Sequence, residues 1–302
     1  MTTDARDRLR RLPRIRRARE YRLYTVDGRR IVDLWQAGGR AILGHRGAGV
    51  VSAVKRVLEH GTLAPLPSVQ ERRLEQTLRR LFPERPELRV AVYASEERAI
   101  AAVSRALGVP AAACIPADPV FRVFAAGGAG ESGGGGAGQS NAREAGAPGG
   151  AAGGALRPGV WYWRPFLPAD EAWAALVWSS VLLPILPDGG LFPVQPVVYP
   201  ADLGLDLVSD LVPESALAAL TSGAHGLASS DERRVFALDA FTAIGPYLVP
   251  DPTDRYDRVF DGCLASGVLI SPDPGVPSIV PGVYSDGERT QIITAVRRVL
   301  SE

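Results

Sequence analysis

Lysine is almost absent from this chain of 302 residues. Of its 34 basic residues, 33 are arginine, and Lys55 is the only lysine. Any reaction of this chain that needs a lysine amine must therefore use Lys55. Cysteine is scarce as well. Cys114 and Cys263 have no paired spacing, which excludes a disulfide framework and a cysteine-based zinc site.

Long hydrophobic runs and an excess of one charge sign are also missing. No apolar stretch approaches the roughly 18 residues of a membrane span, so we expect no membrane partner. The 34 basic and 33 acidic residues leave a net charge of +1, which argues against nucleic acid as a partner of the whole chain. The three histidines are scattered, and we predict no metal site. No secretory signal is recognisable, so we expect a cytoplasmic protein.

Arginine is concentrated near the start of the chain. Residues 6–30 hold eleven arginines against Asp7, Glu20 and Asp27, a local balance of 11 − 3 = +8. The stretch contains no serine and leads directly into strand-like sequence, unlike a transit peptide. The simpler interpretation is a solvated arm or helix ahead of the first strand. The alternative is an arm that binds an anionic partner.

Turn residues and hydrophobic periodicity predict an α/β chain. Two alternating segments flank Asp27-Gly28, which is typical of a β-hairpin. Buried strands are expected over 89–93, 181–186 and 267–271. Helices are expected over 50–60, 69–81, 97–107, 205–220, 232–241, 256–266 and 286–300, with Lys55 on the polar face of the first.

A glycine-rich stretch interrupts this order. Fourteen of the thirty-five residues from Ala125 to Gly159 are glycine, and hardly any could be buried. Phosphate-binding loops place only a few glycines between a strand and a helix, so this composition predicts a disordered insertion instead.

Three stretches carry a more specific pattern. A D-G-x-x-h-h-D motif at 27–33 is followed by Gly38-Gly39 and then by Ile42-Leu43-Gly44-His45. The helix over 74–83 and the tail over 260–272 complete the pattern. These stretches resemble class III aminotransferases, which are fold-type I enzymes that use pyridoxal phosphate and include glutamate-1-semialdehyde aminomutase. The resemblance covers about the first 110 and the last 65 residues.

The resemblance implies a cofactor site that this sequence alters. The family opens its phosphate-binding helix with S-G-[ST]-E-A, whereas this chain has Ser95-Glu96-Glu97-Arg98-Ala99. Two carboxylates there would repel a phosphate, and Ser95 is more simply a helix N-cap. The family also places a carboxylate against the pyridinium nitrogen and a Schiff-base lysine later in the chain. Asp188 is the candidate for that carboxylate, although an aspartate in a turn is the simpler interpretation. No lysine follows it.

We therefore predict an α/β, fold-type I transferase-like architecture with a reduced large domain and a small α+β domain. The expected division is 1–60 for the arm and the first part of the small domain, 61–124 and 160–240 for the large domain, 125–159 for the insertion and 241–302 for the rest of the small domain.

Three functions stay open at this point. The first is a degenerate, non-catalytic class III aminotransferase-like protein that pairs with itself or with an active paralogue. The second is an active pyridoxal-phosphate-dependent aminotransferase or aminomutase with an atypical site. The third is a scaffold or anion-binding protein that uses the basic arm. The missing lysine favours the first, with no catalytic residue and with Ser95 and Asp188 as remnants of cofactor binding.

Overall fold

The structure is a computed structural model of the whole chain. It describes residues 2–61, 65–83, 87–121, 159–167, 179–230, 233, 235–253 and 255–301. The predicted insertion at 125–159 lies outside the described residues except for Gly159.

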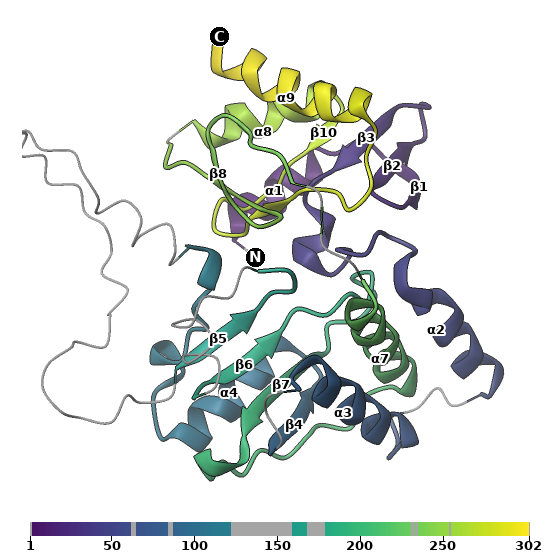
Figure 1. Ribbon diagram of the computed structural model, residues 1–302, viewed down its shortest axis with the longest axis vertical. Coiled ribbons are helices and arrows are strands. Elements are labelled where there is room, and N and C mark those ends of the chain that lie inside the picture. The colour runs from purple at the N-terminus through teal and green to yellow at the C-terminus, as the bar shows by residue number, and fades with distance from the viewer. Residues whose placement is uncertain are drawn as a thin grey trace, which may run out of the picture.

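One sheet joins the two ends of the chain (Figure 1). Its strands, in spatial order, are β1 (Ile15–Arg19), β2 (Arg22–Thr25), β3 (Arg30–Asp33) and β10 (Val268–Leu269). The predicted hairpin is confirmed: β2 and β3 are antiparallel, and Gly28 takes a φ of 85° that favours glycine. β10 then pairs in parallel with β3, so the N-terminal and C-terminal segments share one sheet.

Three helices accompany this sheet, and a second small sheet lies beside it (Figure 1). The helices are α1 (Thr3–Arg10), α8 (Tyr256–Ala265) and α9 (Asp286–Ser301). The strands of the second sheet, in spatial order, are β11 (Ser278–Ile279), β9 (Tyr247–Pro250) and β8 (Phe241–Ile244). α9 begins after the expected capping box, in which Glu288 accepts from the Ser285 backbone and Ser285 from the Glu288 backbone. Ile31, Phe260 and Ile292 are fully buried in the common core.

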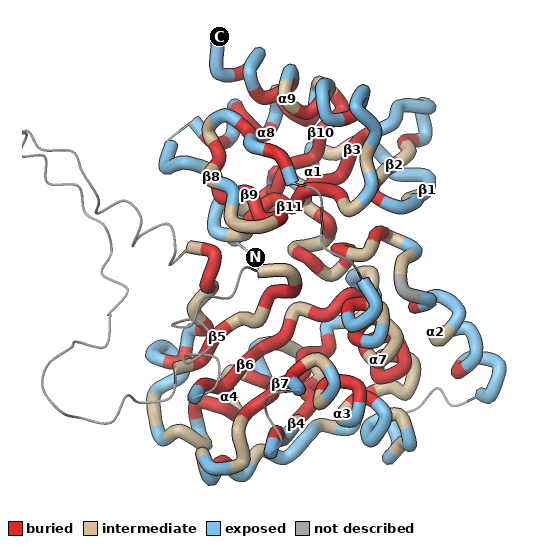
Figure 2. Tube along the Cα trace, viewed as in Figure 1, coloured by how far each residue is buried: buried red, intermediate tan, exposed pale blue. Residues whose placement is uncertain are grey.

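The third sheet forms the centre of the lower half of Figure 1. Its order is β4 (Leu88–Tyr93), β7 (Gln195–Pro200), β6 (Val181–Pro184) and β5 (Val160–Trp163). β5 and β6 are parallel, and β7 is antiparallel to both of its neighbours. Neighbouring residues such as Leu182 and Leu183 point to opposite faces, so the sheet borders two cores. Figure 2 shows its strands as largely buried.

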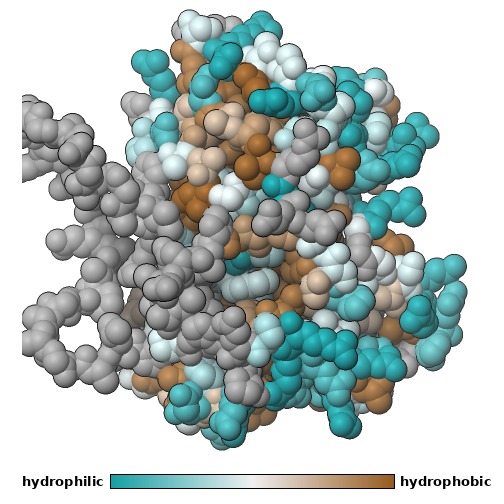
Figure 3. Space-filling model, in the orientation of Figure 1, coloured by the Kyte–Doolittle hydropathy of each residue, from teal (hydrophilic) through white to brown (hydrophobic). Residues whose placement is uncertain are grey.

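Helices cover both faces of this sheet, as in an α/β fold. The helices are α2 (Val50–Glu59), α3 (Val69–Leu81), α4 (Glu96–Leu107) and α7 (Glu214–Ala228). α3 and α7 pack on one face and α4 on the other, while α2 packs against α7. The bounds predicted for α3 are confirmed, and Figure 3 shows hydrophilic side chains over its outer face. Short 3-10 turns are η1 (Gln36–Gly39), η2 (Gly47–Gly49), η3 (Ala111–Ala113) and η4 (Ala201–Leu203).

Two of the expected helices are wrong. The helix expected over 205–220 begins only at Glu214, because Pro213 disfavours a helical conformation for the residue before it. The preceding residues are held against β4 instead: Asp210 N donates to Val92 O at 2.8 Å, and Val92 N donates to Ser209 Oγ at 3.0 Å. The helix expected over 232–241 is absent from the described part of that range, where Leu238 pairs with Phe241 at the start of β8.

No helix in the described part of the chain is long and apolar enough to cross a membrane. The domain boundaries given above stay a prediction.

Candidate functional site

The carboxyl ends of the parallel strands β5 and β6 are the expected place for a ligand. In open α/β sheets, ligands bind in the crevice beyond such strand ends. β5 leads from Trp163 into Arg164, and β6 leads from Pro184 into Ile185. The residues that follow each strand therefore define the candidate site.

Arg164 closes the end of β5 through a buried ion pair. Its side chain is 3% exposed, and its Nε and Nη2 atoms lie 3.0 Å from Asp118 Oδ1 and 2.5 Å from Asp118 Oδ2. Burial opposes the charge and the Asp118 carboxylate favours it, with the net result that the pKa of Arg164 is raised. Arg164 is therefore a permanent cation that is already neutralised inside the chain.

Asp188 is buried at the end of the segment that follows β6. Its Oδ2 atom accepts from Arg40 Nη1 at 3.1 Å, and its Oδ1 atom accepts from Gly190 N at 2.9 Å, which is an Asx turn. Burial raises the pKa of Asp188, and the Arg40 guanidinium acts in the opposite direction. Both carboxylate oxygens are thus bound by groups of this chain, and Arg40 also donates to Phe192 O at 2.6 Å.

The η1 turn covers these strand ends from the side of the other two sheets. Gly39 has a φ of 108°, and a Cβ atom there would lie 3.1 Å from Ile185 Cγ2. Arg164 Nη1 donates to Gly38 O at 3.3 Å. From β9, the buried Tyr247 hydroxyl donates to Pro165 O at 2.6 Å, and burial raises the pKa of Tyr247. The crevice beyond β5 is therefore packed with the chain's own side chains.

Ser95 is the N-cap of α4. Its hydroxyl oxygen accepts from Arg98 N at 3.3 Å, and its hydrogen bond to Glu97 lowers the pKa of that carboxyl. The Glu96 carboxylate accepts a hydrogen bond from the Tyr162 hydroxyl of β5, and burial raises the pKa of Tyr162. The helix N-terminus beside β5, where an anion would be favoured, is thus supplied with a carboxylate from the chain.

Lys55 lies on α2, away from these groups. Its side chain is 74% exposed, and its Nζ atom is 3.6 Å from Glu59 Oε1 one helical turn later. Figure 1 shows α2 on the outer side of α7, at the opposite side of the third sheet from α4.

The structure places Asp188 after β6, where Arg40 binds it. At the end of β5 it brings Asp118 and Tyr247 to Arg164. The sequence did not single out any of these four partners. One signal was available: Arg164 directly follows the apolar Trp161-Tyr162-Trp163 run, where a charge is unexpected unless it is paired. Among the histidines, His45 Nε2 lies 2.8 Å from the buried Asp33 Oδ2.

This arrangement is the fold of the class III, pyridoxal-phosphate-dependent aminotransferases in a reduced form, as the sequence predicted. An aminotransferase from Vibrio fluvialis, solved in a PMP-bound form, superposes with a TM-score of 0.64. The superposition covers 100% of this chain and 95% of that chain at 14% sequence identity, so the likeness concerns the fold alone.

Sequence comparison finds relatives over shorter stretches of the chain. An uncharacterised protein of Treponema pallidum is 38% identical over 128 residues, which cover 38% of this chain and 41% of that protein. A glutamate-1-semialdehyde 2,1-aminomutase of Syntrophus aciditrophicus is 35% identical over 94 residues, which cover 31% of this chain and 22% of the aminomutase. The matches thus span less than half of each relative. No protein-family model matches the chain.

Proposed function

We propose that this chain is a class III aminotransferase-like protein that does not catalyse transamination. The observation that carries the proposal is the closed end of β5, where Arg164 and Asp118 form a buried ion pair beneath Gly38. A buried, satisfied pair of this kind belongs to the packed interior of the protein, and opening it would leave an unpaired charge.

The described residues do not fit pyridoxal phosphate. Its phosphate would meet the Glu96 carboxylate, which Tyr162 holds at the start of α4, and like charges repel. Its pyridinium nitrogen would need the negative charge of a carboxylate, whereas Asp188 is already paired with the Arg40 guanidinium, a cation that would repel the pyridinium. Its aldehyde would need an amine, and Lys55 is on the outer face of α2. Arginine cannot replace that amine, because its guanidinium stays protonated.

The proposed role is binding rather than catalysis. A protein that keeps the fold but lacks the catalytic groups can still act through its surface. We therefore propose that the chain acts in the cytoplasm as a homodimer or as the partner of an active paralogue. An active enzyme with an atypical site remains the competing hypothesis, and it requires Lys55 to reach the cofactor.

Reductive trapping tests the proposal. Purified protein is incubated with pyridoxal phosphate, reduced with borohydride and mapped by peptide mass spectrometry, with Lys55→Ala as the matched control. We expect no stoichiometric adduct and no transaminase turnover. A stoichiometric adduct on Lys55, lost together with activity in Lys55→Ala, would contradict the proposal and favour the active enzyme.

A second candidate function rests on the basic arm. Part of the arm is used internally: Arg8 Nε lies 3.0 Å from Asp257 Oδ1, and Arg11 Nη1 lies 2.8 Å from Asp261 Oδ2, which fasten α1 to α8. On the outer strand β1, however, Arg16 and Arg19 are exposed. These charges favour an anion-binding scaffold.

Polyphosphate binding at increasing salt tests this second function. We expect binding that weakens with salt and is lost in the double variant Arg16→Gln/Arg19→Gln. Polyphosphate affinity that does not change with salt concentration, or that the double variant retains, would exclude the arm as the anion site.

A further inference from the structure

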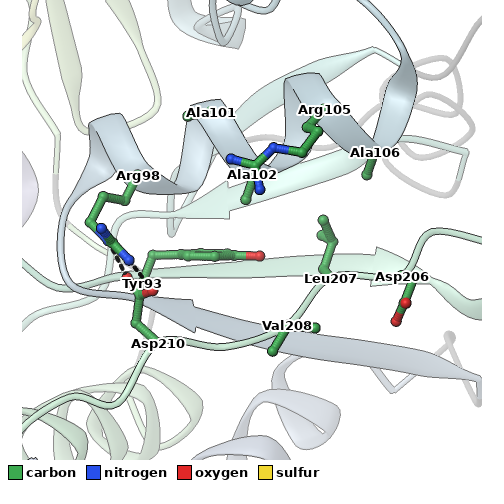
Figure 4. Close-up of a pocket in the computed structure, with 10 residues that line it drawn as sticks. All are labelled: Tyr93, Arg98, Ala101, Ala102, Arg105, Ala106, Asp206, Leu207, Val208 and Asp210. Carbon is green, nitrogen blue, oxygen red and sulfur yellow. Dashed lines mark hydrogen bonds and ion pairs between the residues drawn. The ribbon is translucent and has the colours of Figure 1, made fainter.

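We propose that the groove between α4 and residues 205–210 binds a small organic anion, with its carboxylate or phosphate group on Arg105 and an apolar body on the aliphatic lining. This site is separate from the strand ends considered above and does not depend on the function proposed for them. The groove encloses about 410 Å³ and is shown in Figure 4. A volume of this order suits a small molecule.

The walls of the groove are fixed before any ligand arrives. On one side, Arg98 holds Asp210 in a two-point ion pair, with Nε–Oδ2 and Nη2–Oδ1 distances of 2.6 and 2.5 Å. Asp210 also accepts from Ala94 N at 3.0 Å, and its own N–H is bonded to Val92 O. The 205–210 segment is therefore tied to β4, and the groove is preorganised, which lowers the cost of binding.

The floor contains a polar group without a partner. Tyr93 is 3% exposed, and its hydroxyl forms no hydrogen bond with the described residues. In Figure 4 its ring lies between α4 and the 205–210 segment, with the hydroxyl directed towards Leu207. Buried polar groups are nearly always hydrogen-bonded, so an unbonded hydroxyl in the lining of a cavity indicates a missing acceptor.

The charge of the groove favours an anion as that acceptor. Arg98 is neutralised by Asp210, whereas Arg105, two turns further along α4, forms no ion pair with the described residues. Figure 4 shows Arg105 extending over the groove on the same side as the Tyr93 ring. Arg105 supplies a cation and Tyr93 supplies a hydrogen-bond donor, which are the groups that bind carboxylate and phosphate oxygens.

The remaining lining defines the rest of the ligand. Ala102 and Ala106 leave room along α4, and Leu207 faces them from the other wall. Val208 also lines the groove. These side chains offer aliphatic contacts and no hydrogen bonds, which suits a ring or a short hydrocarbon chain. Asp206 stands at the far end, so a second anionic group there would be repelled. The predicted class is a monocarboxylate or a phosphate monoester with one apolar group.

Ligand-observed NMR titration of the full chain tests this site. The probes are benzoate and phenyl phosphate, with benzyl alcohol as the uncharged analogue and inorganic phosphate as the analogue without a ring. The variants are Arg105→Gln and Tyr93→Phe. Arg56→Gln is the matched control, because Arg56 is an exposed arginine in the last turn of another helix. Tyr93→Phe removes only an oxygen without a partner, so the fold is expected to persist.

We expect at least one of the two ring anions to bind more tightly than both analogues. Arg105→Gln is expected to weaken binding roughly tenfold or more, and Tyr93→Phe roughly threefold or more, since each removes a contact to a charged ligand group. Arg56→Gln should bind as the unmodified chain does. Preference for benzoate identifies a carboxylate ligand, and preference for phenyl phosphate identifies a phosphate monoester. Failure of both ring anions to bind, tighter binding of either analogue, or full affinity in Arg105→Gln or Tyr93→Phe would overturn the proposal.

Discussion

The guanidinium of Arg164 and the carboxylate of Asp118 form a buried pair at the carboxyl end of β5, with their closest atoms 2.5 Å apart. Arg164 belongs to the residue run that ends β5, and Asp118 follows Ala117, which itself pairs in parallel with Trp161. The pair therefore fastens the β5 edge of the third sheet at the place where an α/β fold ordinarily leaves a ligand crevice.

Replacing Arg164 alone is expected to be costly. Arg164→Leu leaves the Asp118 carboxylate buried without its partner, which costs about 3–5 kcal/mol in the free energy of unfolding. Chemical denaturation followed by tryptophan fluorescence measures this. Arg297→Gln is the control, because the Arg297–Asp239 pair is more than half exposed on both sides and should be worth less than about 1 kcal/mol.

The double variant Arg164→Leu/Asp118→Leu separates a missing partner from a missing side chain. We expect it to be more stable than Arg164→Leu, because no unpaired charge remains. A double variant less stable than the single one would show that the pair contributes more than mutual neutralisation.

Gly39→Ala is expected to loosen the turn that covers the strand ends. Gly39 and Gly28 both have positive φ values, which cost an alanine about 1–2 kcal/mol. Only Gly39 has a close neighbour, Ile185 Cγ2 at 3.1 Å, whereas a Cβ on Gly28 meets no atom within 4 Å. Gly39→Ala should thus destabilise the chain by about 1–3 kcal/mol more than Gly28→Ala. Equal melting temperatures for the two variants would contradict the packing described for η1.

Acid should release α1 from α8. The hydrogen bond from Arg8 lowers the pKa of Asp257 below its ordinary value of 3.8. A carboxyl whose folded-state pKa is depressed stabilises the fold fully above about pH 5 and loses that contribution as pH falls through the folded-state pKa. Amide exchange in α1 should therefore rise below pH 3.8 earlier than exchange in α7. Asp257→Asn should give fast exchange in α1 already at neutral pH; slow exchange there would show that the Arg8 pair does not hold the helix.

Restoring the glycine and the hydroxyl of the family motif at positions 96 and 97 should restore phosphate affinity at α4. The double variant Glu96→Gly/Glu97→Thr removes two carboxylates from the first turn, each worth roughly 1 kcal/mol against an anion, or about fivefold in affinity. Equilibrium dialysis with pyridoxal phosphate should show tighter, non-covalent binding, with no borohydride-stable adduct. Glu214→Gly removes a first-turn carboxylate from α7 and should leave binding unchanged. Unchanged binding in the double variant would show that Glu96 and Glu97 are not what excludes phosphate.

Local signals in the sequence predicted several of the elements. Asp27-Gly28 specified the hairpin, the periodicity over 69–81 specified α3, and Ser95 specified the start of α4. Each signal acts within a few residues, through a turn conformation, a helical face or a cap. The resemblance of the chain ends to class III aminotransferases likewise predicted the fold, which the superposed structures share.

By itself the sequence determined that one lysine is available, that it lies on a polar helix face and that the phosphate motif is altered, because each of these depends on residue identity or on neighbours in the chain. Only the tertiary structure decided what closes the strand ends and what lines the groove on α4. Arg164 and Asp118 are 46 residues apart, Arg40 and Asp188 are 148 apart, and the 205–210 segment is extended because it bonds to β4 instead of forming a helix of its own. Such partners are brought together by the packing of the whole sheet. The same packing buries the Arg164 guanidinium with a partner and the Tyr93 hydroxyl without one.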